Sequence, residues 1–213
     1  MIEWWGTVVV EYYAATEGGV VTMIEAQEWL AKPGSVGRAV APTRIYIAGP
    51  HGEELPPGEI GRVFFRRAVA QDFHYHGDEA KTRAAHLGPG LYTYGELGYV
   101  DADGYLFLTG RESHTIVSGG VNIYPAEVEA ALLAHEAVSD VAVVGVADDE
   151  FGERVLATVQ LTPDLLPEQA PAVLERHCRT LLAGFKVPRV WRFVERLPRD
   201  ETGKLRRDAL DRP

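Results

Sequence analysis

The sequence predicts an α+β protein, in which a small β-rich subdomain is followed by a compact α/β domain. Up to about residue 110, short apolar runs alternate with polar residues and are separated by glycines and prolines. Beyond residue 111, strand patterns alternate with helical patterns. A chain of 213 residues with 46% hydrophobic and 24% charged content can bury a core in each part. We therefore expect a boundary near Gly110, with domains at residues 1–110 and 111–213.

The elements of the first part are predicted by β-branched and aromatic runs that end in turn residues. Residues 7–12 predict a strand that leads into a polar turn ending in Gly18 and Gly19. Residues 44–48 and 62–66 alternate as strands do. Asp103-Gly104 stands between two apolar runs, and this dipeptide favours a short hairpin turn.

The second part predicts the order strand, helix, strand, strand, helix, strand. The expected elements are residues 115–118, 126–133, 138–146, 154–161, 168–182 and 190–194. Residues 138–146 are nearly continuous in apolar residues, as in a strand with both faces covered, and we expect this strand to be central in its sheet. Pro125 followed by Glu127 and Glu129 is typical of a helix N-terminus.

Composition argues against several classes of partner. The formal net charge of -10 repels a polyphosphate backbone, so we expect no nucleic-acid partner and no attraction to anionic lipid. No apolar run reaches the roughly 18 residues of a membrane span, and no signal-peptide pattern begins the chain, so the expected location is cytoplasmic. The one cysteine, Cys178, lies in a helical pattern and is interpreted as a packed side chain.

Four segments in order give the chain a family resemblance. They are Glu11-Tyr-Tyr-Ala-Ala-Thr-Glu-Gly-Gly, Tyr94-Gly-Glu-Leu-Gly-Tyr, the run from Gly110 to Glu129 that contains Gly-Gly-Val-Asn-Ile-Tyr-Pro, and Leu197-Pro-Arg-Asp-Glu-Thr-Gly-Lys-Leu-Arg-Arg. Together they resemble the C-terminal part of the adenylate-forming acyl-CoA synthetases. The resemblance implies two steps, in which a carboxylate and ATP give an acyl-adenylate and pyrophosphate, and the thiol of coenzyme A then displaces AMP. It also implies that the C-terminal domain rotates between the steps.

The first two segments imply nucleotide-binding residues. By resemblance, Tyr13 contacts adenine, Thr16 lies near the phosphates, and Glu17 binds Mg²⁺, which prefers carboxylate oxygens together with phosphate oxygens. In the second segment the family has an aspartate on the ribose hydroxyls, whereas this chain has Glu96, with Tyr94 where threonine is usual. Read alone, these segments would predict polar turns.

The third segment resembles the hinge and the loop that follows it. The resemblance implies that Arg111 approaches the ribose and that Ser113 is the pivot, where lysine or aspartate is common, followed by His114 where an acid is common. It also implies that Ser118, Gly119 and Gly120 line a tunnel for the pantetheine arm of coenzyme A. Glycines lack a Cβ and allow such an approach, although a simple two-glycine turn at a strand end is the alternative.

The last segment implies a catalytic lysine. By resemblance, Lys204 reaches the reacting carboxylate and the α-phosphate, where a placed cation stabilises developing charge. Lys204, Arg206 and Arg207 cluster at the start of a short terminal helix, where cations oppose the helix dipole, and we interpret the cluster as facing an anion. Lys186, in Gly-Phe-Lys-Val-Pro, resembles a residue near the nucleotide end of coenzyme A.

One further segment invites a metal-site interpretation. His74 and His76 flank Tyr75, but two histidines at this spacing without a third ligand are interpreted as surface strand residues.

The family's phosphate loop, rich in Ser, Thr and Gly, has no counterpart before Glu11. The chain is therefore expected to be a truncated product, an expressed fragment or one half of a split ligase, and to be close to inert alone. ATP or AMP, Mg²⁺ and coenzyme A are the expected ligands, a fatty or other hydrophobic acid the expected substrate, and a missing N-terminal half or a second copy of the chain the expected partner. The alternative is a non-catalytic module that binds nucleotide or coenzyme A, or that docks to a partner chain.

Overall fold

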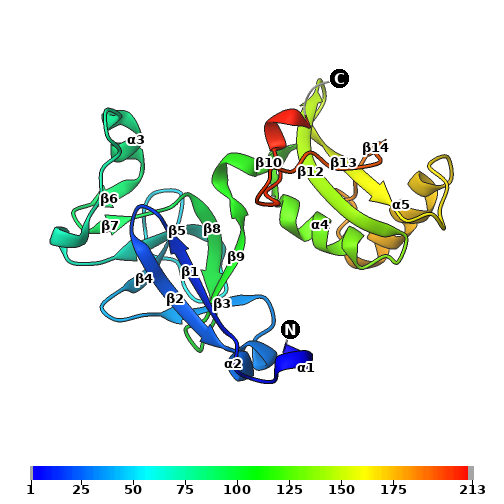
Figure 1. The fold of residues 1–213 in the computed structure, drawn as a ribbon. Coiled ribbons are helices and arrows are strands. Elements are labelled where there is room, and N and C mark those ends of the chain that lie inside the picture. Colours follow the sequence, from blue (N-terminus) through cyan, green and yellow to red (C-terminus); the bar gives the residue numbers. More distant parts are fainter. Residues whose placement is uncertain (1, 211–213) are drawn as a thin grey trace. The chain divides into compact units, whose positions relative to one another are not determined.

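A computed structural model of the chain describes residues 2–210, apart from the side chains of Gln71 and Asp208. The fold divides into two compact units, Met1–Glu112 and Ser113–Pro213. In Figure 1 the first unit runs from blue to green and the second from green to red. Each unit is described by itself.

Unit 1 is a nine-stranded antiparallel sheet with short helices at its margins (Figure 1). The strand order is β1-β2-β3-β9-β8-β5-β7-β6, and β4 pairs with β5. Consecutive strands are often joined by glycine turns, because a left-handed backbone at such turns favours residues without a Cβ. The elements are α1 (Ile2–Trp5), β1 (Val10–Ala15), β2 (Gly19–Glu25), α2 (Ala26–Ala31), β3 (Ser35–Ala39), β4 (Arg44–Ala48), β5 (Gly61–Arg66), η1 (Val69–Gln71), α3 (Glu79–Ala84), β6 (His86–Gly88), β7 (Leu91–Tyr92), β8 (Glu96–Val100) and β9 (Leu106–Arg111).

The core of unit 1 confirms the prediction of a β-rich subdomain. Val21, Phe65, Tyr92 and Leu106 are fully or almost fully buried and come from four different strands. The predicted strands 44–48 and 62–66 correspond to β4 and β5, while the first strand lies three residues later than expected. The loop at Asp103-Gly104 joins β8 and β9 as a hairpin, with a longer turn than a two-residue loop because Val100 pairs with Leu106.

Unit 2 is a five-stranded sheet with two helices. The order is β11-β10-β13-β12, with β14 parallel to β13 and all other pairs antiparallel. The predicted series of strands and helices is present, with one additional short strand, β11. The elements are η2 (Glu112–His114), which spans the boundary of the units, β10 (Ile116–Ser118), β11 (Val121–Ile123), α4 (Pro125–Leu133), β12 (Val138–Asp148), β13 (Gly152–Leu161), α5 (Ala170–Leu181), β14 (Val190–Phe193) and η3 (Arg207–Ala209).

The prediction that residues 138–146 form a central strand is wrong. The central position belongs to β13, and within the described residues β12 pairs with β13 alone. Val143 packs in the cluster with helices α4 and α5, whereas Val144 packs in a second cluster with Leu197 and Leu210 of the C-terminal segment. The continuous apolar run therefore reflects two covered faces, which an edge strand can also have.

Helix α5 carries the cysteine into the core. Cys178 is fully buried, and burial raises the pKa of its thiol to about 11. The predicted packed, unreactive cysteine is therefore consistent with its surroundings. Helix α4 begins at Pro125, where proline costs no hydrogen bond, as expected from the sequence.

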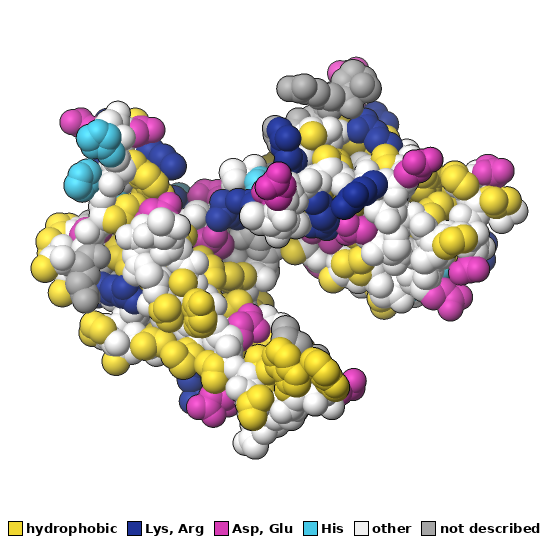
Figure 2. All heavy atoms as spheres, viewed as in Figure 1, with side chains coloured by type: hydrophobic (Ala, Val, Ile, Leu, Met, Phe, Trp, Pro, Cys, Tyr) yellow, Lys and Arg dark blue, Asp and Glu magenta, His cyan; other side chains and the backbone are white. Residues whose placement is uncertain are grey.

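Unit 1 also exposes apolar side chains near its N-terminal helix. Trp4 is 80% exposed and stacks on Trp5 with ring centroids 5.3 Å apart, and Val8 and Tyr12 are also exposed. Figure 2 shows hydrophobic side chains gathered over this region, at the bottom of the view near α1. Among the described residues, no helix has the length and apolar character needed to cross a bilayer.

Candidate functional site

The register of two strands brings Glu96 and Arg111 together. Glu96 begins β8, Arg111 ends β9, and the two residues are direct partners in the antiparallel ladder. Side chains of directly opposed residues share one face of a sheet. Arg111 Nη2 lies 3.2 Å from Glu96 Oε1, and the two predicted nucleotide-binding residues therefore form an ion pair inside unit 1.

Glu96 lies in an environment that opposes its ionisation. Its exposure is 8%, and burial raises the pKa of the carboxyl above its usual range despite the opposing effects of Tyr13 and Arg111. Glu96 Oε2 and the Tyr13 hydroxyl oxygen are buried and have no well-formed hydrogen bond among the described residues. Burial, followed by the nearby Glu96 carboxyl, raises the pKa of the Tyr13 hydroxyl. A carboxylate oxygen beside the Tyr13 hydroxyl can also accept a hydroxyl group of a ligand.

Tyr13 stands in β1 beside two other aromatic rings. Its centroid lies 6.0 Å from that of Phe65 and 6.1 Å from that of Tyr94, the latter in an edge-on arrangement. Because Tyr94 stands where the resembled family usually has threonine, this cluster has one more aromatic ring than the family pattern would give it. A half-buried aromatic surface of this kind can accept a planar base.

Thr16 and Glu17 lie on the exposed turn between β1 and β2. The Tyr75 hydroxyl donates to Glu17 Oε1 at 3.2 Å, across 58 residues of sequence. The sequence pattern does not single out Tyr75, because it predicts a histidine-containing surface strand at this segment. That strand prediction is wrong, since residues 73–76 form a loop, although His74 and His76 are exposed as expected. No group of three metal-binding side chains occurs among the described residues.

The glycine pair in unit 2 forms the two-residue loop of the β10–β11 hairpin. Ser118 pairs with Val121, and Gly119 and Gly120 have φ angles of 57° and 79°. Two positive φ angles match the tight turn that suits the twist of a hairpin. A simple two-glycine turn at a strand end, the alternative to a tunnel lining, is thus sufficient to account for both glycines.

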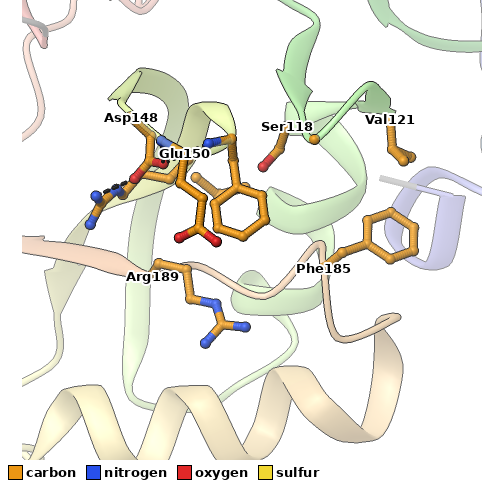
Figure 3. A pocket seen from close by; sticks show the side chains of 10 residues that line it. Ser118, Val121, Asp148, Glu150, Phe185 and Arg189 are labelled. Carbon is orange, nitrogen blue, oxygen red and sulfur yellow. Dashed lines mark hydrogen bonds and ion pairs between the residues drawn. The ribbon is translucent and has the colours of Figure 1, made fainter.

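A surface pocket of about 790 Å³ lies beside this hairpin (Figure 3). Ser118 and Gly119 line it together with Phe151 and Phe185. Glu150 and Arg189 lie on one side of the pocket, and Val121 and Phe185 on the other, so charged and apolar surfaces face the same space. The pocket can hold a ligand with an apolar arm and a polar end.

Lys204 lies in an exposed turn that is well ordered by hydrogen bonds. Asp200 Oδ1 accepts the backbone N–H of Lys204 at 3.0 Å and that of Thr202 at 2.9 Å. Arg199 donates to the Gly203 carbonyl at 2.9 Å and to both carboxylate oxygens of Asp140 at 2.8 Å. Through Arg199, the turn that carries Lys204 is attached near the start of β12, while the Lys204 side chain is exposed.

Two cations that the sequence singled out, Arg207 of the terminal cluster and Lys186, are paired inside unit 2. Arg207 Nη2 donates to Glu129 Oε1 at 2.9 Å, and Arg207 Nη1 donates to the Val143 carbonyl at 2.6 Å. Lys186 Nζ lies 2.7 Å from both carboxylate oxygens of Glu127. The interpretation of Arg207 as facing an external anion is wrong, because Glu129 supplies the anion. Ser113 lies in η2, exposed, at the first residue of unit 2.

Two family models match the chain in the expected order. Residues 1–71 match the AMP-binding enzyme family, and residues 127–204 match the AMP-binding enzyme C-terminal domain. The chain belongs to the AMP-binding enzyme family.

Its relatives in this family include acyl-CoA ligases. The chain is 33% identical over 200 residues to the uncharacterized acyl-CoA ligase YhfT of Bacillus subtilis, covering 94% of this chain and 39% of the relative. It is 36% identical over 214 residues to the human mitochondrial acyl-coenzyme A synthetase ACSM1, covering 96% and 36%. The chain thus spans about 40% of the length of these relatives.

A solved AMP-binding enzyme has the same fold. The o-succinylbenzoate CoA synthetase of Bacillus subtilis, in complex with its acyl-adenylate, superposes with a TM-score of 0.85 at 31% identity, covering 96% of this chain and 41% of that one. The same enzyme in complex with ATP and magnesium gives a TM-score of 0.81.

Proposed function

We propose that this chain carries the C-terminal catalytic elements of an ATP-dependent acyl-CoA synthetase. In this reaction a carboxylate oxygen attacks the α-phosphorus of ATP and pyrophosphate leaves. The thiolate of coenzyme A then attacks the acyl carbon, the bond to the phosphate oxygen breaks, and AMP leaves. The main support is the ion pair of Glu96 and Arg111, in which the second carboxylate oxygen, Glu96 Oε2, is buried without a well-formed hydrogen bond. In sequence, the pair lies between the two segments that match the family models.

The unit 1 residues suit the sugar and base of a nucleotide. Glu96 Oε2 makes no well-formed hydrogen bond among the described residues and could accept a ribose hydroxyl, while Arg111 Nη2 lies 3.2 Å from Oε1. The Tyr13 ring offers a surface for adenine. The exposed Glu17 carboxylate would hold Mg²⁺ beside Thr16, and the ion would supply charge neutralisation at the phosphates.

The unit 2 residues suit the second substrate and the lysine step. The pocket of Ser118, Gly119 and Phe185 would take the pantetheine arm of coenzyme A. Lys204 would stabilise charge at the carboxylate and the α-phosphate during the first step alone. Relatives that act on hydrophobic acids support a fatty or other hydrophobic acid as the substrate, including a long-chain-fatty-acid–CoA ligase of Mycobacterium tuberculosis that is 36% identical over 203 residues.

The Lys204→Ala variant tests this proposal in the complete enzyme, formed by this chain together with the remaining part of an AMP-binding domain. Loss of one placed charge-stabilising donor costs about 10²- to 10³-fold in rate. We expect adenylation from acid and ATP to fall by that factor, while thioester formation from preformed acyl-adenylate stays within about twofold. Pyrophosphate release and acyl-CoA formation measure the two steps.

Arg196→Ala is the matched control, because Arg196 is an exposed cation of the same unit. It should change neither half-reaction. Equal losses of both steps in Lys204→Ala would indicate a folding defect or a shared binding role, and no loss in either would contradict the catalytic assignment.

A non-catalytic module that binds nucleotide or coenzyme A is the second candidate. It is favoured by Glu96 in place of the family's aspartate and by the burial of that carboxyl. Calorimetric titration of the 213-residue chain with AMP and with coenzyme A, alongside an assay of pyrophosphate release, separates the two candidates. Binding without turnover in both the chain and the complete enzyme would favour the module. Release of pyrophosphate by the chain alone, above a heat-treated control, would contradict the expectation that it is inert by itself.

A further inference from the structure

The turn that carries Thr16 and Glu17 is fixed by an arginine from a distant part of unit 1. Arg67 follows β5, and its side chain is half-buried. Its Nη1 donates to the Gly18 carbonyl at 2.6 Å, its Nη2 donates to the Val20 carbonyl, and its Nε donates to Thr43 Oγ1 at 2.7 Å. One guanidinium therefore joins the turn to the loop that precedes β4.

The geometry of these contacts requires a guanidinium. The three acceptors belong to different residues and are reached by three different nitrogens of one planar group. A lysine ammonium is a single point and cannot reach the same spread of acceptors. The partners are two carbonyls and a hydroxyl, so these contacts fix the position of the backbone without neutralising an acid.

Other contacts leave the turn little freedom to move. A Cβ added at Gly18 would lie 2.2 Å from the Tyr94 hydroxyl oxygen, so the backbone of the turn packs directly on that ring. The Tyr75 hydroxyl also donates to Glu17 Oε1. Thr16 and Glu17 are exposed, but the backbone beneath them is attached through Arg67 and packed against Tyr94.

We propose that Arg67 is a positioning residue for the turn from Thr16 to Gly19, and that through this turn it sets where the Glu17 carboxylate meets a nucleotide-bound Mg²⁺. The role in metal placement rests on the proposed function. The role in holding the turn does not, and the two are tested separately.

Hydrogen exchange on the 213-residue chain tests whether Arg67 holds the turn. In Arg67→Ala, we expect amides in residues 14–22 to exchange about tenfold faster or more, because three hydrogen bonds to this segment or its support are lost. Residues 113–213 should exchange as in the parent chain. Arg66→Ala is the matched control, since Arg66 is the adjacent arginine and is exposed. Equal exchange in the two variants would overturn the proposal.

Two conservative variants test the hydrogen bonds of Arg67 separately from its charge and from global folding. Arg67→Lys preserves the charge and should behave like Arg67→Ala, and parent-like exchange in it would overturn the requirement for a guanidinium. If Arg67→Ala does not fold, Thr43→Val removes only the hydroxyl acceptor and should give a smaller increase in exchange confined to the same segment. No increase in that variant would count against the proposal.

Nucleotide titrations test the effect on metal placement. Arg67→Ala should weaken binding of ATP with Mg²⁺ by about tenfold, because Glu17 is displaced, while AMP binding without metal changes by less than about twofold. Equal weakening of both would overturn the link to the metal. If the parent chain binds neither nucleotide, the proposed nucleotide function of this chain fails, and the exchange experiment still decides whether Arg67 holds the turn.

Discussion

The Glu96 carboxyl is expected to make unit 1 more sensitive to pH. Because its folded-state pKa is raised above the value of about 4.3 for an unfolded chain, the folded state binds more protons between the two values. Stability from this group is present below pH ~4.3 and is lost as the pH rises through the folded-state pKa. Ionised Glu96 therefore costs stability at neutral pH.

The Glu96→Gln variant isolates this effect. Glutamine keeps the shape and an acceptor for Arg111 but does not ionise. The free energy of unfolding of the variant, relative to that of the parent chain, should therefore increase from pH 4 to pH 7. Urea unfolding at the two pH values measures the difference. The exposed Glu59→Gln serves as the control and should show a much smaller change. A difference that is the same at both pH values would contradict a raised pKa for Glu96.

At the residue scale, the sequence singled out residues that lie close together in the structure, but it did not predict all of their partners. The β8–β9 register places Glu96 beside Arg111, and Tyr13 of β1 lies near the Glu96 carboxyl. The partner of Arg207 was not predictable, because Glu129 lies 78 residues away and local dipole arguments contain no information about it. The contact of Tyr75 with Glu17 was not predictable either, since it depends on the folding of a loop between β5 and α3.

The left-handed backbone of the β10–β11 hairpin loop is expected to favour glycine at both of its positions. A Cβ added at Gly120 would meet open space, so Gly120→Ala should destabilise unit 2 only through its left-handed backbone, by about 1–2 kcal/mol. Gly120→Asn should cost less, because asparagine tolerates this conformation. Thermal or urea unfolding of unit 2 provides the measurement.

Gly184→Ala is the matched control for the hairpin. Gly184 also has open space around an added Cβ, but its backbone is outside the left-handed region, so the change should stay within about 0.5 kcal/mol. If Gly120→Ala and Gly184→Ala proved equally stable, the hairpin turn would not require glycine.

Strand β12 should be sensitive to truncation on both of its faces. Val143 and Val144 point into different apolar clusters, and removing two methyl groups from either should cost about 1.5–2.5 kcal/mol. Val143→Ala and Val144→Ala should therefore have similar effects on urea unfolding of unit 2, and Val117→Ala, at a 47% exposed position, should have little. A loss at Val143 alone would show that the C-terminal segment does not stabilise the second face.

At the element scale, burial was predictable and neighbour order was not. The apolar run of β12 correctly indicated that both faces are covered, but it could not show that one cover is a C-terminal segment carrying Leu197 and Leu210. Strand order depends on pairings between distant residues, such as that of Leu156 in β13 with Val190 in β14. The period of a single run does not contain this information.

For the whole molecule, limited proteolysis should separate the two units. Each has an apolar core of its own, and the division falls between Glu112 and Ser113. Connections between domains have few buried contacts, so we expect preferential cleavage at residues 110–115 and a stable C-terminal product. Mass spectrometry of the fragments and circular dichroism of the product provide the measurements. Digestion of the whole chain as one unit, without a stable product, would contradict independent folding of residues 113–213.

The buried thiol of helix α5 makes the chain suited to single-site labelling. A maleimide reacts with the thiolate, and Cys178 is fully buried with the pKa of its thiol raised to about 11. A cysteine introduced at Glu201, an exposed residue in the same turn as Lys204, would therefore accept a fluorophore without prior removal of the native thiol. A dye at this position would follow the Lys204 turn in real time as substrates are added.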